Sequence, residues 1–220
     1  MLSEYQKFFT ARPTPQIAKD LLGRLLVFHG RKGDVGGWIV ETEAYVGEQD
    51  SASHAFGGRR TDYSESLYGM PGNLYIYQIR SHYCVDIVVQ DPEEPQGILI
   101  RALEPALGIE QMIENRGQDG FNLTNGPGKL MQALGVQSRS MDGQPMEHAA
   151  LQVDLRTERR IPVKIIAGPR IGVNAQGKDA LKDYRFIVAG NPYVSKMKRR
   201  DADDLTHGWS GFECRLAINK

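Results

Sequence analysis

Val40-Glu41-Thr42-Glu43-Ala44-Tyr45 alternates two kinds of residue, which is the period of a β-strand. As a strand, it turns its two glutamates and its tyrosine to one face and packs its other three residues inward. A carboxylate beside an aromatic ring suits catalysis, because the ring can stack on a planar substrate while the carboxylate manages a proton or a water. The alternative is an ordinary solvated strand face, which is common in half-covered sheets.

The segments on either side of this strand predict further elements. We expect a helix over 15–23, with Thr14 as its cap and Gly23 at its end. A strand over 25–28, a turn over 31–37 and a strand over 38–46 follow. Residues 47–72 have little periodicity, and so long a loop inside a compact domain is usually functional.

Two apolar runs, 74–77 and 83–89, flank a short polar stretch and predict a β-hairpin. Next come a strand over 98–103, a helix over 106–114, and a helix over 127–134 that Asn125 caps and Gly135 ends. Strands over 163–166 and 184–188 complete the pattern. Because helices and strands do not alternate regularly, the fold class is predicted to be α+β with a largely antiparallel sheet.

The composition limits the class of protein. The chain has 220 residues, 40% of them hydrophobic, which suits one large domain or at most two small ones. Its two cysteines, Cys84 and Cys214, argue against a disulfide framework or a cysteine-bound metal cluster. Neither a secretory signal nor an apolar run of the roughly 20 residues that span a bilayer is visible. We therefore expect a cytosolic or nuclear protein that is neither secreted nor membrane-bound.

The net charge is zero, whereas a dedicated electrostatic nucleic-acid binder usually has a basic excess. Local basic groups still occur at Arg59-Arg60, at Arg80 and over 196–200. The last cluster is followed at once by three aspartates, so we expect a solvated face there.

Common catalytic motifs are absent from the sequence. It contains no phosphate-binding glycine loop, no His-Glu-x-x-His motif and no nucleophile elbow, so no metal or cofactor is predicted. What remains is a carboxylate with aromatic rings. Tyr75 and Tyr77 share one face of the hairpin strand, either as core residues or as part of a pocket. In the second interpretation Tyr45, His54 and Tyr77 stack on a flat, flipped-out base, with Glu43 at its edge.

Several segments are distinctive when taken together and in order. They include Glu41-Thr42-Glu43-Ala44-Tyr45-Val46-Gly47, Ala52-Ser53-His54, Met70-Pro71-Gly72-Asn73-Leu74-Tyr75-Ile76-Tyr77, and the ranges 99–105, 126–134 and 190–195. This series resembles the alkyladenine DNA glycosylase family, also called 3-methyladenine DNA glycosylase. The resemblance covers roughly residues 13–196 and is far more specific than a single motif.

The resemblance implies a single mixed α/β domain over 1–220, built around a curved antiparallel sheet, with a hairpin that enters the DNA minor groove. It implies a monofunctional glycosylase of base excision repair that removes alkylated or deaminated purines and needs no cofactor. The implied partner is double-stranded DNA containing damaged purines. No feature predicts an oligomer, so we expect a monomer.

The resemblance also implies roles for individual residues. Glu43 matches the catalytic glutamate that activates water, and Arg101 matches an arginine beside that water. The alternative for Arg101 is a salt bridge with a neighbouring strand, such as that of Glu104. The three aromatic residues named above match those that sandwich the base, and the backbone near Ala52 matches the segment that reads the base edge.

The chain departs from the family in two places near this site. The hairpin tip, Gln78-Ile79-Arg80-Ser81-His82, lacks the family's wedge tyrosine, and Ile79 or Arg80 is a candidate to replace it. Asp86 stands where the family has an asparagine that rejects guanine.

The tail over 198–220 matches no family segment, although Trp209 and Phe212 within it are expected to pack on the domain. Two other functions stay open: a lesion-binding protein with weak or lost catalysis, and a hydrolase of free nucleosides.

Overall fold

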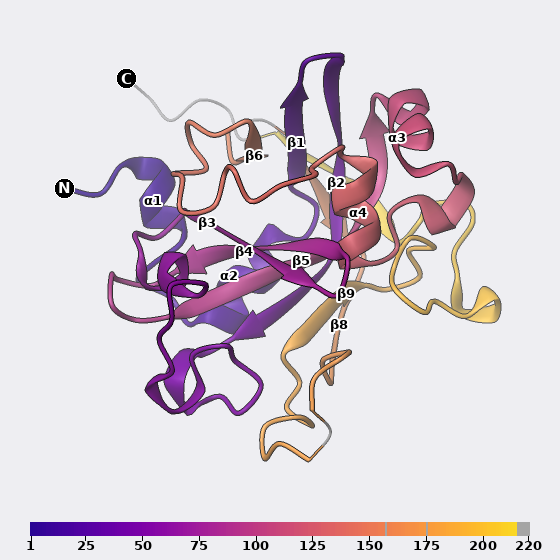
Figure 1. Cartoon of the computed structure of the whole chain (residues 1–220). Coiled ribbons are helices and arrows are strands. Elements are labelled where there is room, and N and C mark those ends of the chain that lie inside the picture. The colour runs from indigo at the N-terminus through magenta and orange to yellow at the C-terminus, as the bar shows by residue number, and fades with distance from the viewer. Residues whose placement is uncertain (157, 175, 215–220) are drawn as a thin grey trace.

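The computed structural model describes residues 1–156, 158–174 and 176–214 (Figure 1). Its helices are α1 (Glu4–Phe8), α2 (Thr14–Leu21), α3 (Ile109–Arg116) and α4 (Pro127–Ala133). Its strands are β1 (Leu25–Gly30), β2 (Gly33–Tyr45), β3 (Leu74–Ile79), β4 (His82–Val89), β5 (Gln96–Leu107), β6 (Leu151–Asp154), β7 (Glu158–Pro162), β8 (Ile165–Gly168), β9 (Arg185–Val188) and β10 (Trp209–Cys214).

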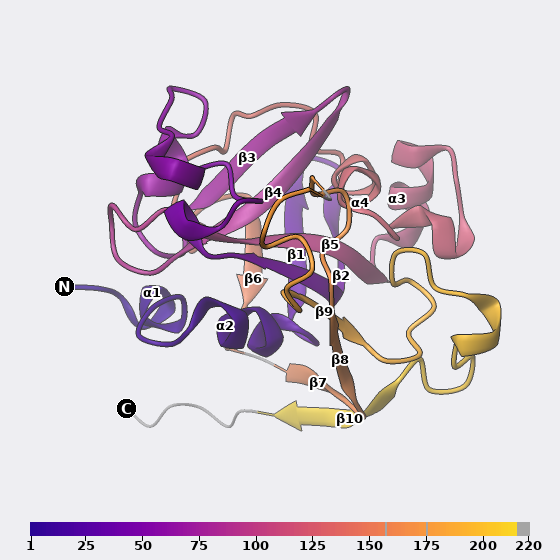
Figure 2. The same cartoon turned by 90° about the horizontal axis from the view of Figure 1, so that it is seen from below.

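A mixed α/β domain is built around one antiparallel sheet, as predicted. The strand order is β3-β4-β5-β2-β1-β6, with β9 pairing β2 and β8 pairing β9. In Figure 2 the β3–β4 hairpin projects from one side of the molecule, while β7 and β10 form a separate pair on the far side.

The alternation of residues in β2 explains the two faces of the sheet. Val40 and Ala44 join the main hydrophobic core, and the Thr42 hydroxyl donates to the Ala18 carbonyl in α2. Tyr45 instead packs on a second apolar cluster that contains Tyr75 and Tyr77. The assignment of faces is thus confirmed. The solvated alternative is wrong, because Glu41 and Glu43 are completely buried.

The predicted turn over 31–37 is present but shorter: it contains only Arg31 and Lys32, because β2 already begins at Gly33. Gly36 and Gly37 belong to the strand for a steric reason. A Cβ at either position would lie 2.3 Å from a backbone oxygen of a neighbouring strand, that of Leu26 or of Glu104. Two glycines therefore mark a close approach of three strands here, and the resulting 13-residue strand carries the polar residues into the middle of the sheet.

Other boundaries also moved. The hairpin turn contains only Arg80 and Ser81, since Ile79 pairs with His82. Strand β5 continues to Leu107, so the predicted helix over 106–114 begins only at Ile109. Neither proposed cap donates or accepts as expected: Thr14 lies inside α2, and the carboxamide oxygen of Asn125 accepts from Lys129.

The first part of the unmatched tail is integrated into the fold. Trp209 is buried and donates its indole N–H to Glu104, and β10 pairs with β7. Phe212 is more than half exposed, with its ring edge-on to Trp38. Residues 215–220 lie outside the described part of the chain.

Among the described residues, no helix is both long and apolar enough to span a bilayer. The same residues contain no group of three or more His, Cys, Asp or Glu side chains placed to hold a metal ion.

Candidate active site

A cavity of about 550 Å³ opens on the face of the sheet that carries the polar residues of β2. Its walls come from β2, the loop after it, the hairpin, β5, the start of α4 and the segment 171–174. The predicted site residues that line it are Tyr45, Ala52, His54, Tyr77, Ile79, Arg80, Asp86 and Arg101. Segments far apart in the sequence therefore meet at one place.

Aromatic rings form one wall of the cavity. Tyr75 and Tyr77 stack with ring centroids 4.9 Å apart, as expected for residues on one strand face. His54 stands nearly perpendicular to Tyr77, at 4.8 Å, so these two rings contact each other directly. Because His54 and Tyr77 are in contact and nearly perpendicular, a planar ligand can stack face to face on only one of these two rings. Tyr45 also lines the cavity.

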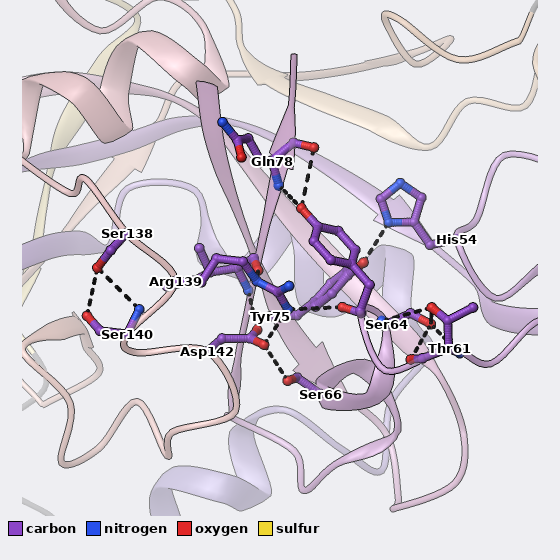
Figure 3. A network of polar contacts seen from close by, with 12 residues as sticks. His54, Thr61, Ser64, Ser66, Tyr75, Gln78, Ser138, Arg139, Ser140 and Asp142 are labelled. Carbon is purple, nitrogen blue, oxygen red and sulfur yellow. Dashed lines mark hydrogen bonds and ion pairs between the residues drawn. The ribbon is translucent and has the colours of Figure 1, made fainter. Parts of the chain in front are cut away.

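Tyr75 determines the orientation of His54. The Tyr75 hydroxyl lies 2.8 Å from His54 Nδ1, a contact drawn in Figure 3. Burial raises the pKa of Tyr75 and lowers the pKa of His54, so the hydroxyl keeps its proton and the imidazole is neutral. With the hydroxyl donating to Nδ1, the imidazole carries its own proton on Nε2.

Glu43 lies directly behind this cavity. Its Oε1 accepts from the Ile171 N–H at 2.7 Å, and its Oε2 accepts from the Tyr45 hydroxyl at 2.8 Å and from Arg101 at 3.3 Å. All three donors line the cavity, although Glu43 itself is completely buried. Burial raises the pKa of Glu43 in spite of these donors, which makes its carboxylate a stronger base than an exposed one.

Arg101 bridges two glutamates of β2. Its Nε donates to Glu41 at 3.0 Å, and its Nη1 donates to Glu43. Glu41 also accepts from Arg185 at 2.6 Å and from the backbone N–H of Ser195 at 2.7 Å. The alternative prediction, a salt bridge between Arg101 and a neighbouring strand, is therefore confirmed, but its partners are Glu41 and Glu43 of β2 and not Glu104.

Asp86 reaches the cavity from β4 and is 5% exposed. Within the described part of the chain its Oδ1 has no hydrogen-bond partner. Burial raises the pKa of Asp86 to about 8, against the lowering effect of the Tyr77 hydroxyl and with a further increase from the charge of Glu43. At neutral pH this side chain is mostly a neutral carboxylic acid.

The hairpin tip stands at the mouth of the cavity. Ile79 is 51% exposed, and Arg80 adopts a left-handed backbone conformation with φ of 55°. Polar side chains hold the outer edge of β3, as Figure 3 shows. Arg139 donates to the Ile76 carbonyl at 2.7 Å, and Asp142 accepts from the Ile76 N–H at 2.8 Å. The edge strand is thus capped, which stiffens the hairpin.

The loop before His54 is organised by Asp50. Its carboxylate accepts from the N–H groups of Val46 and Ala52, both at 3.1 Å. The Ala52 N–H is therefore occupied, and the Ser53 carbonyl oxygen accepts from the Phe56 N–H at 3.2 Å. Sequence reasoning missed the roles of Ile171 and Glu41. Ile171 acts through its backbone, so its residue type carries no signal.

Comparison with known proteins shows which proteins this chain resembles over most of its length. A family model described as methylpurine-DNA glycosylase (MPG) matches residues 8–192. A Latilactobacillus sakei protein is 51% identical over 203 residues, covering 92% of this chain and 95% of the relative. Proteins of Lactobacillus delbrueckii (49% over 209 residues, 94% and 99%) and Enterococcus faecalis (41% over 219 residues, 99% and 95%) also match. All three are named "Putative 3-methyladenine DNA glycosylase".

Proposed function

Because this chain belongs to the methylpurine-DNA glycosylase family, and is therefore a DNA-repair glycosylase, we propose that it flips alkylated or deaminated purines out of duplex DNA and hydrolyses their N-glycosidic bond. One observation carries the proposal. A buried carboxylate with a raised pKa, that of Glu43, is joined by hydrogen bonds to three groups that line an aromatic cavity. We place this activity on cellular DNA, in the cytosol or the nucleus.

The aromatic cavity replaces the stacking that a base loses when it leaves the duplex. Extruding a base requires a few kcal/mol, and stacking on an aromatic side chain returns about 1–3 kcal/mol per base. Tyr45 faces one side of the base, and one ring of the perpendicular pair formed by His54 and Tyr77 stacks on the other side. A purine that alkylation has made cationic is further stabilised by the faces of the tyrosine rings.

Glu43 acts as the general base. It removes a proton from a water that attacks the sugar C1′, while the glycosidic C–N bond breaks and the base leaves with the bonding electron pair. The ionised carboxylate also stabilises the positive charge that develops on the sugar. Arg101 and the Ile171 backbone hold this carboxylate beside the cavity. Since no lysine acts as a nucleophile, the product is an abasic site.

Asp86 contacts the edge of the base. Its unpartnered Oδ1 can accept a hydrogen bond from the exocyclic amine of a guanine-type base. The Ala52 carbonyl oxygen supplies a second acceptor at the same edge. We therefore expect alkylated guanines among the substrates, together with weaker rejection of normal guanine than an asparagine provides.

Ile79 is the wedge that fills the space left by the base. It is the apolar side chain of the hairpin tip, it is half exposed, and the capped edge of β3 keeps the tip stiff. Apolar side chains serve as wedges between base steps in the minor groove. The adjacent Arg80 is placed to contact phosphate.

The test is single-turnover excision on duplex oligonucleotides that carry hypoxanthine, 7-methylguanine, a 3-methyladenine analogue or an undamaged purine. Base release from a lesion, lost in Glu43→Gln, supports the proposal. Retained release in that variant contradicts the mechanism. Tight binding that weakens steeply with salt, without release, favours the lesion-binding alternative, which the altered hairpin tip motivates.

A further inference from the structure

Arg170 and Asp50 form an ion pair in which neither side chain is exposed. The guanidinium meets the carboxylate with two parallel hydrogen bonds, of 2.5 and 2.7 Å. Removing two charges from water costs several kcal/mol for each, and apolar residues often replace such a pair without loss of stability. The pair therefore calls for an explanation beyond stability.

The Asp50 side of the pair shapes one wall of the cavity. Through its bonds to the N–H groups of Val46 and Ala52, Asp50 closes the turn that leads from β2 into the lining segment 51–54. That segment ends at His54, which is one of the base-stacking rings in the proposed function.

The Arg170 side of the pair reaches the other wall and the carboxylate. Arg170 donates to the Ala44 carbonyl at 2.9 Å, and its guanidinium carbon lies 4.7 Å from the centre of the Tyr45 ring. The next residue, Ile171, donates its N–H to Glu43 and begins the lining segment 171–174. One guanidinium thus contacts the end of β2 and the start of the loop that leads to His54. The residue that follows Arg170 in the chain binds the Glu43 carboxylate.

We propose that Arg170 is a positioning residue for the reaction: its ion pair with Asp50 keeps the two cavity walls in register and holds the Ile171 N–H on Glu43. The inference rests on the proposed function for its catalytic consequence, but its structural part can be tested separately. A planar guanidinium is required, because a lysine supplies the charge without the two parallel donors.

The chain contains a matched control pair. Arg160 donates to Glu104 at 2.7 Å and stacks on aromatic rings, and its Nε lacks a hydrogen-bond partner, as does that of Arg170, within the described residues. None of its contacts reaches the cavity. Replacing either arginine by lysine therefore disturbs an ion pair with a carboxylate. The Arg160 pair is less buried, and only the Arg170 pair adjoins Glu43.

The first measurement is hydrogen exchange of the Ile171 amide in the wild type, Arg170→Lys and Arg160→Lys. We expect slow exchange in the wild type and in Arg160→Lys, and exchange at least tenfold faster in Arg170→Lys. Equal protection in all three proteins would overturn the inference. This readout requires no excision, so it decides the inference even if the proposed function fails.

The second measurement is the pH profile of single-turnover excision with the same proteins, all kept folded. Groups that face Glu43 and titrate or carry charge are Glu41, Tyr45, Asp86, Arg101, Arg170 and Arg185. The Ile171 N–H stabilises the ionised form of Glu43, so Arg170→Lys should move the midpoint to higher pH and lower the rate about 100-fold. A wild-type midpoint in Arg170→Lys would contradict the proposal.

A double variant, Asp50→Asn with Arg170→Gln, guards against misfolding. It removes both charges together and leaves no uncompensated buried charge. Its amides cannot restore together the two parallel bonds between residues 170 and 50, the bond to the Ala44 carbonyl and the contact with the Tyr45 ring. We therefore expect a folded protein with the same fast exchange at Ile171, and wild-type protection there would again overturn the inference.

Discussion

Glu43 and Glu104 are two buried glutamates on neighbouring strands, and their surroundings give them opposite acidities. Both oxygens of Glu104 are surrounded by donors, from Arg160 and His207 on Oε1 and from Asn191 and Trp209 on Oε2. Hydrogen bonds from these partners hold the pKa of Glu104 below its usual range, although burial opposes them. Around Glu43 the effect of burial outweighs that of the donors, so the pKa of Glu43 is raised.

The hydrogen-bond partners of the two carboxylates explain why one suits a structural role and the other the proposed catalytic role. Those of Glu104 come largely from the segment 191–209, so this glutamate fastens the end of the chain to the sheet. Those of Glu43 line the cavity. A carboxylate saturated with donors is a weak base, whereas a desolvated one is a stronger base. The comparison shows that residue type and burial alone do not identify a catalytic glutamate.

The largest expected effect comes from exchanging each glutamate for glutamine. Glu43→Gln should lower excision by about 10²- to 10⁴-fold, because it removes the proposed general base. Glu104→Gln should leave excision within a few-fold of wild type but lower the free energy of unfolding by about 3 kcal/mol at pH 7. Single-turnover kinetics and urea unfolding measure the two effects. Strong loss of excision in Glu104→Gln would remove the distinction.

The pH dependence of stability should also have opposite signs. A lowered pKa stabilises the fold above the unfolded value of about 4.5, so the deficit of Glu104→Gln should disappear as the pH falls through the folded pKa. A group with a raised pKa stabilises the fold at low pH, and this contribution is lost as the pH rises towards the folded pKa. Relative to wild type, Glu43→Gln should gain stability as the pH rises above about 4.5. Parallel curves for the two variants would be inconsistent with the pKa directions.

Removing one donor from each carboxylate sharpens the comparison. Tyr45→Phe keeps the ring but removes a hydrogen bond that lowers the pKa of Glu43. The midpoint of excision should therefore move to higher pH, and below that midpoint the rate falls about tenfold for each pH unit by which the midpoint rises. Trp209→Phe should instead destabilise the protein by about 2 kcal/mol without moving that midpoint. A shift of the midpoint in Trp209→Phe would contradict the assignment.

Exposed apolar side chains beside Glu43 and beside Glu104 should also differ in their effect on excision. Ile79→Ala should lower excision about fivefold, since a smaller side chain fills the space left by the base less well. Leu205 is an exposed aliphatic residue near Glu104, and Leu205→Ala should have no effect on excision. Undiminished excision of hypoxanthine from duplex DNA by Ile79→Ala would exclude the proposed wedge.

The smallest expected effect concerns Asp86. In Asp86→Asn the amide oxygen would accept from Tyr77, so its NH₂ group would face the exocyclic amine of a guanine-type base. The ratio of 7-methylguanine to hypoxanthine excision should therefore fall about threefold. Wild type should also lose stability relative to this variant as the pH rises from about 4, where Asp86 ionises in the unfolded chain, to about 8, where it ionises in the folded protein. An unchanged ratio would leave Asp86 without a role in base reading.

Much of this architecture could be predicted from local patterns. The alternation in β2 identified both faces, and the hairpin and the largely antiparallel sheet followed from apolar runs. The boundaries failed where tertiary contacts outweighed local preference. Gly36 and Gly37 suggested a turn, but they lie in a strand because neighbouring backbones leave no room for a Cβ.

The sequence by itself determined which residues could meet at the site, because the family motifs name Glu43, Tyr45, His54, Tyr77 and Arg101 in order. It also determined that Asp86 and the hairpin tip depart from those motifs. Only the tertiary structure decided what these groups can do. Acidity depends on burial and on donors from distant segments, such as the Ile171 amide on Glu43 and the Trp209 indole on Glu104. No local pattern encodes these contacts, because they form only when the chain closes around the sheet.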